Sequence, residues 1–258
     1  MNDTVHFEKT LSSETLFEGR VITLTKDTAL LENGKTATRE VVHHHGGACI
    51  LPYFADGTIC MVRQFRYAMQ QQLWELPAGK LEKGEDPFAA AKRELEEECG
   101  LTADNYISLG EFYPTVGYDT EACILPYFAD GTICMVRQFR YAMQQELWEL
   151  PAGKLEKGED PFAAAKRELE EECGLTADNY ISLGEFYPTV GYDTEVIYTW
   201  VATGLHETKM HLDADEFLTP DRVPLEKAYQ MVMSGEIKDG KTIAGILKLK
   251  ALLAEGKL

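Results

Sequence analysis

Two glutamates near the end of one predicted helix are spaced so that they could hold a metal ion. Asp86 is a good N-cap and Gly100 fits the position just beyond a helix C-terminus, so residues 87–99 are predicted to be helical. In that helix Glu94 and Glu98 are four residues apart, which brings their carboxylates together on one face, where they repel. The helix dipole also disfavours anions at this end. A hard divalent cation such as Mg²⁺, which prefers carboxylate oxygens, would relieve the repulsion.

The acidic face of this helix has a simpler alternative, which is that it only contacts solvent. Acidic runs usually do, and Arg93 can pair with Glu97 at the i,i+4 spacing. One arginine does not neutralise the cluster, however, and the segment Leu76-Pro77-Ala78-Gly79-Lys80 brings backbone carbonyls close to the carboxylates. On this helix alone the solvated face is favoured, and it is the loop carbonyls together with the longer motif described below that favour a cation site.

The predicted helix occurs twice, because the chain contains a tandem repeat. Residues 48–121 (copy 1) and 122–195 (copy 2) are identical at every position but one, where Gln72 corresponds to Glu146. Solenoid repeats drift in sequence and number three or more, whereas this pair has not drifted. The repeat therefore indicates a recent or engineered duplication, and it predicts two metal-binding helices in one chain.

The elements that must position these carboxylates are strands with a few helices. An Asn-Gly turn at 33–34 between alternating segments predicts a hairpin near the N-terminus. In copy 1 the predicted strands and helix are residues 48–54, 58–67, 73–76, 87–99 and 106–113. After copy 2 the predicted strand, acidic loop and two helices are residues 196–203, 211–217, 225–234 and 241–255. The chain has no GxGxxG motif, so the fold class is α/β (α+β) and not a doubly wound dinucleotide fold.

Composition excludes several kinds of partner. The formal net charge of the 258 residues is −18, which argues against nucleic acid or an anionic membrane as a partner. The sequence has no apolar stretch of about 18 residues and no N-terminal signal pattern, so we expect a cytoplasmic protein. The six cysteines lack CxxC spacing and lie in apolar runs, which predicts reduced core thiols and not disulfides or zinc ligands.

The predicted metal helix and the loop before it carry a long motif. The residues that match the Nudix box are Gly79, Glu85, Arg93, Glu94, Leu95, Glu97, Glu98, Gly100 and Leu101. Copy 2 repeats the match between Gly153 and Leu175. A match of this length is very unlike a short chance motif. The chain therefore resembles the Nudix hydrolases, which cleave nucleoside diphosphates linked to another group and use Mg²⁺ or Mn²⁺.

Three further segments resemble the ADP-ribose pyrophosphatase branch of that family. They are MVRQFR at 61–66, ELPAGK at 75–80 and LDADEF at 212–217. The resemblance implies a mixed-sheet α/β/α sandwich preceded by a small antiparallel sheet. It also implies hydrolysis of a nucleoside diphosphate sugar, above all ADP-ribose to AMP and ribose 5-phosphate, by a homodimer that exchanges N-terminal segments.

The resemblance assigns roles to residues of both copies. The implied metal ligands are Glu94, Glu98 and the Ala78 carbonyl in copy 1, and Glu168, Glu172 and the Ala152 carbonyl in copy 2. The residues implied to support the loop and the carboxylates are Glu85, Arg93, Glu159 and Arg167. The residues implied to contact the substrate diphosphate or ribose are Arg63, Arg66, Arg137 and Arg140. The implied catalytic glutamates are Glu97 and Glu171, together with Glu216 of the acidic loop, for which Asp213 and Asp215 are alternatives as base.

One departure from the branch bears on the substrate. The branch usually has Pro-Gly shortly after the box, where this chain has Val116-Gly117 and Val190-Gly191. Another sugar nucleotide such as GDP-mannose, or a dinucleotide, is therefore an alternative substrate. A further alternative is an engineered duplication, or a non-catalytic nucleotide-binding module, whose site the duplication has disrupted.

The two copies compete for one set of closing elements. Copy 2 continues directly into residues 196–203. We therefore predict an N-terminal β region at 1–47, a partial module at 48–121 and a complete Nudix core at 122–258. If copy 1 took the closing elements instead, copy 2 would become a long insertion, whose loop-closure cost is small.

Overall fold

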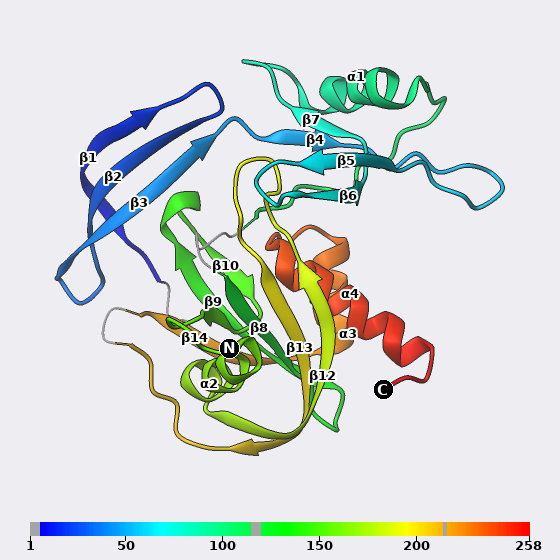
Figure 1. Cartoon of the computed structure of the whole chain (residues 1–258). Coiled ribbons are helices and arrows are strands. Elements are labelled where there is room, and N and C mark those ends of the chain that lie inside the picture. The colour runs from blue at the N-terminus through cyan, green and yellow to red at the C-terminus, as the bar shows by residue number, and fades with distance from the viewer. Residues whose placement is uncertain (1–5, 115–119, 214–215) are drawn as a thin grey trace. The chain divides into compact units, whose positions relative to one another are not determined.

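The computed structural model of the protein describes residues 6–114, 120–213 and 216–258. In this part of the chain several β-sheets and four α-helices form a mixed α+β structure, which confirms the predicted fold class (Figure 1). The chain divides into a larger compact unit of residues 1–9, 30–36 and 109–258, and a smaller one of residues 10–29 and 37–108. None of the described helices is long and apolar enough to cross a membrane.

The central sheet of the larger unit has four strands in the order β11-β8-β13-β12. Their bounds are β8 (Glu121–Pro126), β11 (Ala152–Lys154), β12 (Leu175–Phe186) and β13 (Ile197–Glu207). β13 pairs in parallel with β8 and antiparallel with β12, so it lies between them. Every residue of β8 is buried, as expected for a strand with a neighbour on each side and cover on both faces.

A second sheet of the larger unit has the order β10-β9-β14. Its strands are β9 (Thr132–Arg140), β10 (Gln145–Glu149) and β14 (Leu218–Pro224), and a 3₁₀ turn at Tyr141–Met143 joins the first two. β9 pairs antiparallel with both neighbours. Both sheets of this unit therefore combine strands of copy 2 with strands from residues 196–258.

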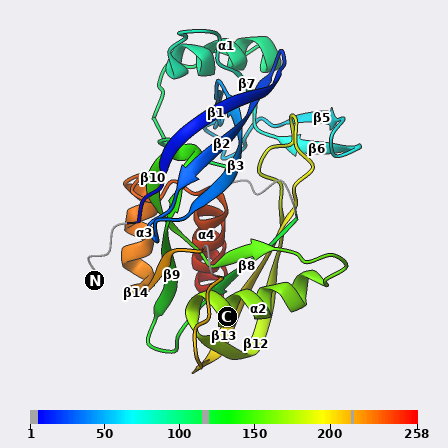
Figure 2. The same cartoon turned by 90° about the vertical axis from the view of Figure 1, so that its left-hand side faces the viewer.

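Helices cover both faces of the central sheet (Figures 1 and 2). The helices of the larger unit are α2 (Pro161–Cys173), α3 (Leu225–Met233) and α4 (Gly240–Ala254). Ala122 and Ile124 of β8 belong to the core beneath α2. Cys123 and Leu125 belong to the opposite core, with α3 and α4. This alternation follows from the two-residue period of a strand, and it produces an α/β/α sandwich.

Most of copy 1 and most of the N-terminal sheet make up the smaller unit. The N-terminal sheet has the order β1-β2-β3, with β1 (Lys9–Glu18), β2 (Ile22–Leu30) and β3 (Thr36–His44). The predicted turn between β2 and β3 is present, because Gly34 has a φ of 78° and Leu31 N donates to Lys35 O at 2.9 Å. Copy 1 forms β4 (Gly47–Cys49), β5 (Val62–Arg66), β6 (Gln71–Glu75), β7 (Ala78–Lys80) and α1 (Pro87–Cys99).

The two copies differ in structure although they are almost identical in sequence. The helix predicted at 87–99 forms in both copies. The strand predicted at 106–113 was wrong for copy 1, where only an isolated bridge at Tyr113 forms, whereas copy 2 forms the long strand β12 from the same sequence. The strand predicted at 48–54 ends at Cys49. The reason is that a strand needs a neighbour, and β13 pairs with β8 and β12 of copy 2.

The cysteines also differ between the copies. All six are free, as predicted. Cys123 and Cys134 are buried in the core, but Cys49 is exposed, so the prediction of a core thiol was wrong for Cys49. Its β4 strand lacks the cover that β8 has in the equivalent position.

A buried charge network links the strands of copy 2 to helix α4. Glu149 accepts hydrogen bonds from Nε and Nη2 of Arg140, both at 2.6 Å, and from Lys241 Nζ. Lys241 also pairs with Asp239 at 3.2 Å, and Asp239 caps α4 by accepting from Thr242 N at 2.9 Å. Buried charges are tolerated when they are paired and hydrogen-bonded. The network therefore requires α4 to dock beside Arg140 and Glu149.

Glu121 is a second buried carboxyl group of this core. It is 5% exposed, and its Oε2 makes no hydrogen bond with any residue that the structure describes. Burial raises the pKa of Glu121. Glu121 precedes copy 2 only because copy 1 ends there, whereas the residue that precedes copy 1 is Gly47. The duplication thus puts a carboxyl group into the core at a position that glycine holds before the first copy.

Glu121→Ala is expected to stabilise the protein by about 1–3 kcal/mol near pH 8, because it removes a buried carboxylate oxygen that lacks a hydrogen bond. The folded-state pKa of Glu121 is raised, so its ionisation destabilises the fold above that pKa and the penalty disappears as the pH falls below the unfolded value. Urea unfolding should therefore show a larger gain near pH 8 than near pH 4. A gain of the same size at both pH values would contradict this explanation.

Candidate active site

Glu168 and Glu172 lie on the face of α2 that meets strand β11. Ala152 N donates a hydrogen bond to Glu172 Oε2 at 3.0 Å. Gly153 comes so close to Glu168 that a Cβ at this position would overlap its carboxylate. Asp160 caps the N-terminus of α2, as predicted for its counterpart in copy 1. The register of α2 against β11 therefore requires glycine at 153.

Arg167 holds the acidic residues of the motif in place. Its Nε and Nη2 contact the two carboxylate oxygens of Glu159, both at 3.0 Å. Its Nη1 contacts Glu168 at 2.6 Å and Glu171 at 2.7 Å. Nη2 also donates to Lys154 O at 3.0 Å. One guanidinium thus joins the loop before α2 to two carboxylates on the helix.

The chain that leads to the acidic loop is attached to the C-terminal end of α2. Thr208 N donates to Gly174 O at 2.7 Å, and His211 N donates to Glu171 O at 3.1 Å. A helix leaves its last carbonyls without helical partners, so these bonds satisfy groups that would otherwise be unpaired. They fix the start of the acidic loop beside the helix that carries the predicted ligands.

Three glutamates at this junction have raised pKa values. Burial raises the pKa of Glu168 to about 7 and that of Glu172 well above its ordinary value. Burial also raises the pKa of Glu216, whose charge adds to the shift of Glu172. Of the alternative bases, Asp213 accepts a hydrogen bond from Glu216 N at 3.1 Å through its backbone carbonyl and not its carboxylate, and Asp215 lies outside the described residues. A positive charge placed among these carboxylates would favour their ionised forms.

A family model described as NUDIX domain matches residues 43–128 and, in a second match, residues 117–244. The chain belongs to the Nudix family. A further model, described as Nucleoside diphosphate sugar hydrolase N-terminal domain, matches residues 8–42.

Several proteins resemble this Nudix chain. The ADP-ribose pyrophosphatase of Bacillus subtilis is 39% identical over 149 residues, which cover 58% of this chain and 80% of that protein. The ADP-ribose pyrophosphatase of Mycobacterium tuberculosis is 40% identical over 127 residues, which cover 49% and 61%. The GDP-mannose pyrophosphatase of Yersinia enterocolitica is 31% identical over 153 residues, which cover 55% and 80%.

A solved structure shares the fold of the Nudix chain. The structure, titled "Crystal structure of ADP compounds hydrolase", has a TM-score of 0.50 at 14% identity and covers 100% of both chains. Identity this low shows similarity of fold alone. The family matches and the relatives identify the chain as a Nudix pyrophosphohydrolase.

Two arginines that were predicted to contact the substrate have protein partners in the Nudix core. Arg137 Nη1 lies 3.3 Å from Glu146 Oε1, and its Nε lies 3.2 Å from Asp221 Oδ2. Arg140 makes the two hydrogen bonds to buried Glu149 that are described above. A substrate diphosphate would have to compete with these carboxylates, so contact between the substrate and either arginine stays a prediction.

The counterparts of these arginines in copy 1 also have neighbours. Arg63 lies over the ring of Trp74, with 5.7 Å between the guanidinium carbon and the ring centroid. Arg66 contacts both carboxylate oxygens of Glu75, at 2.8 and 2.7 Å. Their contact with a substrate likewise stays a prediction.

The Nudix box of copy 1 repeats the local contacts of copy 2. Arg93 contacts the carboxylates of Glu85, Glu94 and Glu97. Ala78 N donates to Glu98 Oε2 at 2.9 Å, as Ala152 N does to Glu172. Glu98 is exposed, however, whereas Glu172 is 2% exposed. Box geometry is therefore local, but the burial that shifts the pKa of Glu172 comes from elements outside the box.

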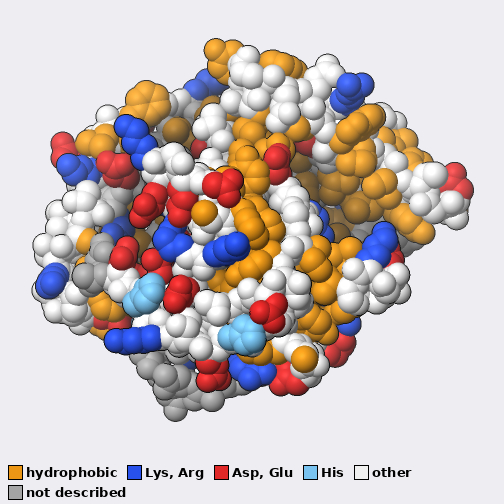
Figure 3. All heavy atoms as spheres, turned by 60° about the horizontal axis from the view of Figure 1, so that its bottom comes forward, with side chains coloured by type: hydrophobic (Ala, Val, Ile, Leu, Met, Phe, Trp, Pro, Cys, Tyr) orange, Lys and Arg blue, Asp and Glu red, His pale blue; other side chains and the backbone are white. Residues whose placement is uncertain are grey.

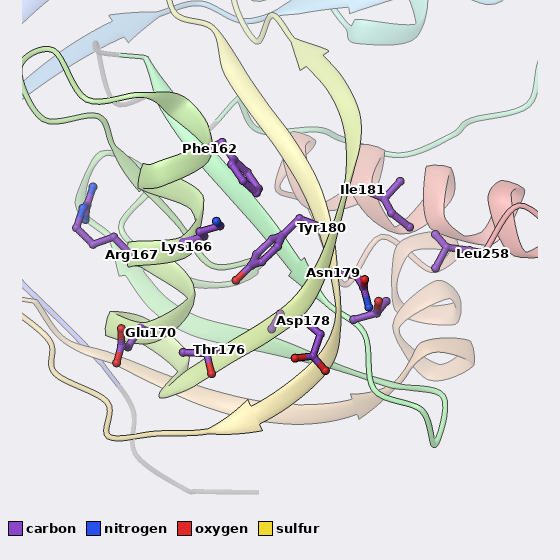
Figure 4. A pocket seen from close by; sticks show the side chains of 12 residues that line it. Phe162, Lys166, Arg167, Glu170, Thr176, Asp178, Asn179, Tyr180, Ile181 and Leu258 are labelled. Carbon is purple, nitrogen blue, oxygen red and sulfur yellow. The ribbon is translucent and has the colours of Figure 1, made fainter.

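A groove of about 930 Å³ lies beside α2 and β12 (Figure 4). Phe162 and Tyr180 meet edge to face there, with 5.1 Å between ring centroids. Lys166 Nζ lies over both rings, at 4.1 and 5.2 Å from their centroids. The rings are thus engaged with each other and with a cation, and the groove does not include the three glutamates with raised pKa values. We therefore assign the active site to the glutamates and not to the groove.

The residues that tie the C-terminal segment to the site were not predicted from the sequence. The segment Asp239-Gly240-Lys241-Thr242 has the pattern of a capped helix start, which was a usable signal for the start of α4. The pairing of Lys241 with Glu149 spans 92 positions in sequence and has no local signal. The backbone bonds from Thr208 and His211 to the end of α2 likewise depend on the fold and not on side-chain type.

Proposed function

We propose that this protein hydrolyses nucleoside diphosphate sugars, ADP-ribose in particular, with Mg²⁺ or Mn²⁺ as the cation. The observation that carries the proposal is the cluster of Glu168, Glu172 and Glu216, which come from α2 and from the acidic loop and all have raised pKa values. Shifts of this kind concentrate at functional sites. The relatives named ADP-ribose pyrophosphatase support the choice of substrate.

The donor set fits a divalent cation. Glu168, Glu172 and the Ala152 carbonyl offer oxygen ligands, the kind that Mg²⁺ prefers. As the side chains lie, no three His, Cys, Asp or Glu residues of the described segments form a complete metal cage. Mg²⁺ requires fewer protein ligands than that, because it keeps several waters and also binds substrate phosphates. When bound, it would supply positive charge to the diphosphate and to the attacking water.

The residues of the chain would position and deprotonate that water. Glu216, whose pKa burial raises, is the proposed base. It would take one proton as the water oxygen bonds to a phosphorus atom and the bridging P–O bond of the diphosphate breaks. Arg167 would keep Glu168 and Glu171 in place through its Nη1. With ADP-ribose the products would be AMP and ribose 5-phosphate.

We further propose that copy 2 and residues 196–258 form the catalytic unit. Strand β13 and the chain that leads to the acidic loop both come from this segment, and both contact copy 2. Copy 1 would be a partial module with a metal helix of its own. The homodimer with exchanged N-terminal segments stays a prediction from the family resemblance.

Gly153→Ala is expected to lower kcat/KM by at least about tenfold, because the added Cβ would displace the Glu168 carboxylate. The substitution is made together with Glu98→Gln, so that only the box of copy 2 can act. Lys157→Ala in the same background is the control, since Lys157 is exposed in the loop before α2 and takes no part in the contacts described above. Equal kcat/KM values for the two alanine variants would show that the close approach at Gly153 has no catalytic role.

The test of the proposed function is a substrate panel with product analysis. The full chain is incubated with ADP-ribose, GDP-mannose or a dinucleotide, with Mg²⁺, Mn²⁺ or EDTA, and the products are separated by chromatography. We expect AMP and ribose 5-phosphate from ADP-ribose with either cation, and no turnover with EDTA. Failure to hydrolyse any member of the panel would reject the proposal.

GDP-mannose is the second candidate substrate. A GDP-mannose pyrophosphatase is among the relatives, and Val190-Gly191 stands where the ADP-ribose branch usually has Pro-Gly. The same panel separates the two candidates. A kcat/KM that is higher for GDP-mannose than for ADP-ribose would replace the first proposal with the second.

A further inference from the structure

Copy 1 already contains the same paired strands as those to which residues 196–258 add further strands in copy 2. Ala48 lies opposite Gly79 across β4 and β7, and Ala122 lies opposite Gly153 across β8 and β11. The ribbons β5-β6 and β9-β10 also share one register. Both copies therefore contain the template that accepts the C-terminal strands.

The strand edges that residues 196–258 cover in copy 2 are open in copy 1. In copy 2, β13 adds to β8 and β14 adds to β9. In copy 1, among the described residues, β4 pairs in a sheet only with β7, and β5 only with β6. These edges of copy 1 keep backbone groups that could pair with an added strand.

Apolar side chains differ between the copies in the same way. Met135 packs in the core with α3 and α4 and is 0% exposed, whereas its counterpart Met61 is 40% exposed. Leu51 and Ile59 are likewise exposed, although their counterparts in copy 2 are buried. We call Leu51, Ile59 and Met61 the open face of copy 1. Exposed apolar side chains such as these three mark a surface that a partner segment can cover. Figure 3 shows that hydrophobic side chains also gather in several patches on one face of the molecule.

The length of the repeat makes the two copies equivalent acceptors. With residues 196–258 on copy 2, copy 1 is an insertion between positions 47 and 122. With the same segment on copy 1, copy 2 would be an insertion of equal length between positions 121 and 196. Loop-closure entropy depends on the length of the insertion, so its cost is the same in both cases. Each arrangement contains one complete module and one partial module.

Only a few residues distinguish the energies of the two arrangements. Glu146 pairs with Arg137 at 3.3 Å, and copy 1 has Gln72 in its place, which favours copy 2 as the acceptor. The residue that precedes copy 2 is Glu121, which is buried, whereas the residue that precedes copy 1 is Gly47. Because burial of a carboxyl group costs free energy, this difference favours copy 1 as the acceptor. These two differences oppose one another, so the acceptor sequences themselves give neither copy a large advantage.

We propose that the chain folds into two arrangements, in which residues 196–258 complete either copy 2, as in Figure 1, or copy 1. The occupant of the open face of copy 1 is thus the C-terminal segment of the same chain. Its contacts with the acceptor would match those that it makes with copy 2, because the two copies offer the same side chains apart from Gln72 and Glu146. The segment also bonds to copy 1 itself, from Tyr113 N to Lys238 O at 2.8 Å and from Gly240 N to Tyr113 O at 3.0 Å, and these bonds belong to the arrangement in Figure 1. Exchange requires the segment to leave a buried core, so the arrangement is set during folding and changes slowly afterwards.

A charge in the acceptor face separates the two arrangements. Met135→Asp blocks copy 2, because it buries a carboxyl group without a partner, and Met61→Asp blocks copy 1. We expect the Met135→Asp chain to keep cooperative urea unfolding, since the segment can complete copy 1. The chain with both substitutions should lose cooperative unfolding. If Met135→Asp alone loses it as fully as the double variant does, while Met61→Asp has no effect, the proposal is overturned.

The native cysteines report which copy is covered. Cys49 is exposed and Cys123 is buried when the segment lies on copy 2. The refolded, reduced chain is labelled briefly with N-ethylmaleimide and digested with trypsin. Peptide 40–63 holds Cys49 and Cys60, and peptide 94–137 holds Cys99, Cys123 and Cys134, so fragmentation of each peptide in the mass spectrometer assigns the label to a single cysteine. In Met135→Asp we expect Cys123 to label at least about tenfold faster than in the unmodified chain, and Cys49 to become protected.

Complementary labelling excludes a simpler explanation. In the unmodified chain, the protected fraction of Cys49 should equal the rapidly labelled fraction of Cys123. Local opening of copy 2 would expose Cys123 without protecting Cys49, and that result would overturn the proposal. Exchanging Gln72 and Glu146 should shift the populations toward copy 1 by about threefold, and Glu121→Ala should shift them toward copy 2 by about tenfold. Populations that respond to neither change would also overturn it.

Discussion

A chain that carries both Glu98→Gln and Glu172→Gln is expected to lose at least about 10³-fold in kcat. Glutamine keeps the shape of each side chain, and with it an acceptor for the bond from Ala78 N or Ala152 N. It brings no negative charge, however, so it cannot hold a divalent cation as a carboxylate does. Both copies are changed because both boxes have the same local geometry. Turnover of ADP-ribose at saturating Mg²⁺ measures the loss.

The matched control for this variant is Glu96→Gln with Glu170→Gln. These are the same substitutions on the same two helices, at positions that we assign to neither the ligands nor the base. We expect kcat within about twofold of the unmodified value, as for surface changes away from the site. If the Glu98 and Glu172 variant kept a tenth or more of the activity, these carboxylates would not be the ligands. The two single variants then divide the activity between the boxes of copy 1 and copy 2.

Lys241→Met is expected to lower the free energy of unfolding by about 3–5 kcal/mol. Lys241 is 2% exposed, and its ammonium group lies between Glu149 and Asp239. Burial opposes its charge, but these carboxylates outweigh burial and raise the pKa of Lys241, so it stays charged at neutral pH. Methionine fills much of the volume of the lysine side chain, but it removes the positive charge that pairs with Glu149 and Asp239. Because Lys241 belongs to the C-terminal segment, the loss applies whichever copy the segment covers.

Lys250→Met is the matched control on the same helix. Lys250 pairs with Glu226 at 2.6 Å in a partly exposed position, and ion pairs of this kind contribute less than about 1 kcal/mol. Urea unfolding at neutral pH compares the two variants. Similar small losses for both would mean that the buried network contributes no more than a surface pair.

The same network predicts the response of the protein to acid. Burial opposes ionisation of Glu149, but Arg140 and Lys241 lower its pKa to about 2. A lowered folded-state pKa contributes stability above the unfolded value, and that stability is lost as the pH falls through the folded value. The unmodified protein should therefore lose this contribution progressively as the pH falls from the unfolded value to about 2, whereas Lys241→Met, which lacks much of it, should unfold at a higher pH.

The sequence by itself determined the local parts of the site. Spacing and caps predicted the helix at 87–99, and the structure forms it in both copies with the same bounds. The i,i+4 spacing predicted that Arg93 could pair with Glu97, and it does so at 3.0 Å, as Arg167 does with Glu171 at 2.7 Å. The physical reason is that helix hydrogen bonds, caps and i,i+4 contacts join residues close in sequence. Two identical segments therefore give two identical local structures.

The strand pairing of residues 196–258 with copy 2 is decided only in the tertiary structure. Residues 101–112 and β12 have the same sequence, yet only the second forms a strand, because β13 lies beside it. Glu98 is exposed and Glu172 is buried, although their local surroundings match. Strand pairing and burial depend on partners that are distant in sequence, and this chain has one C-terminal segment for two acceptors. No local pattern can specify that choice, because the pattern is the same in both copies.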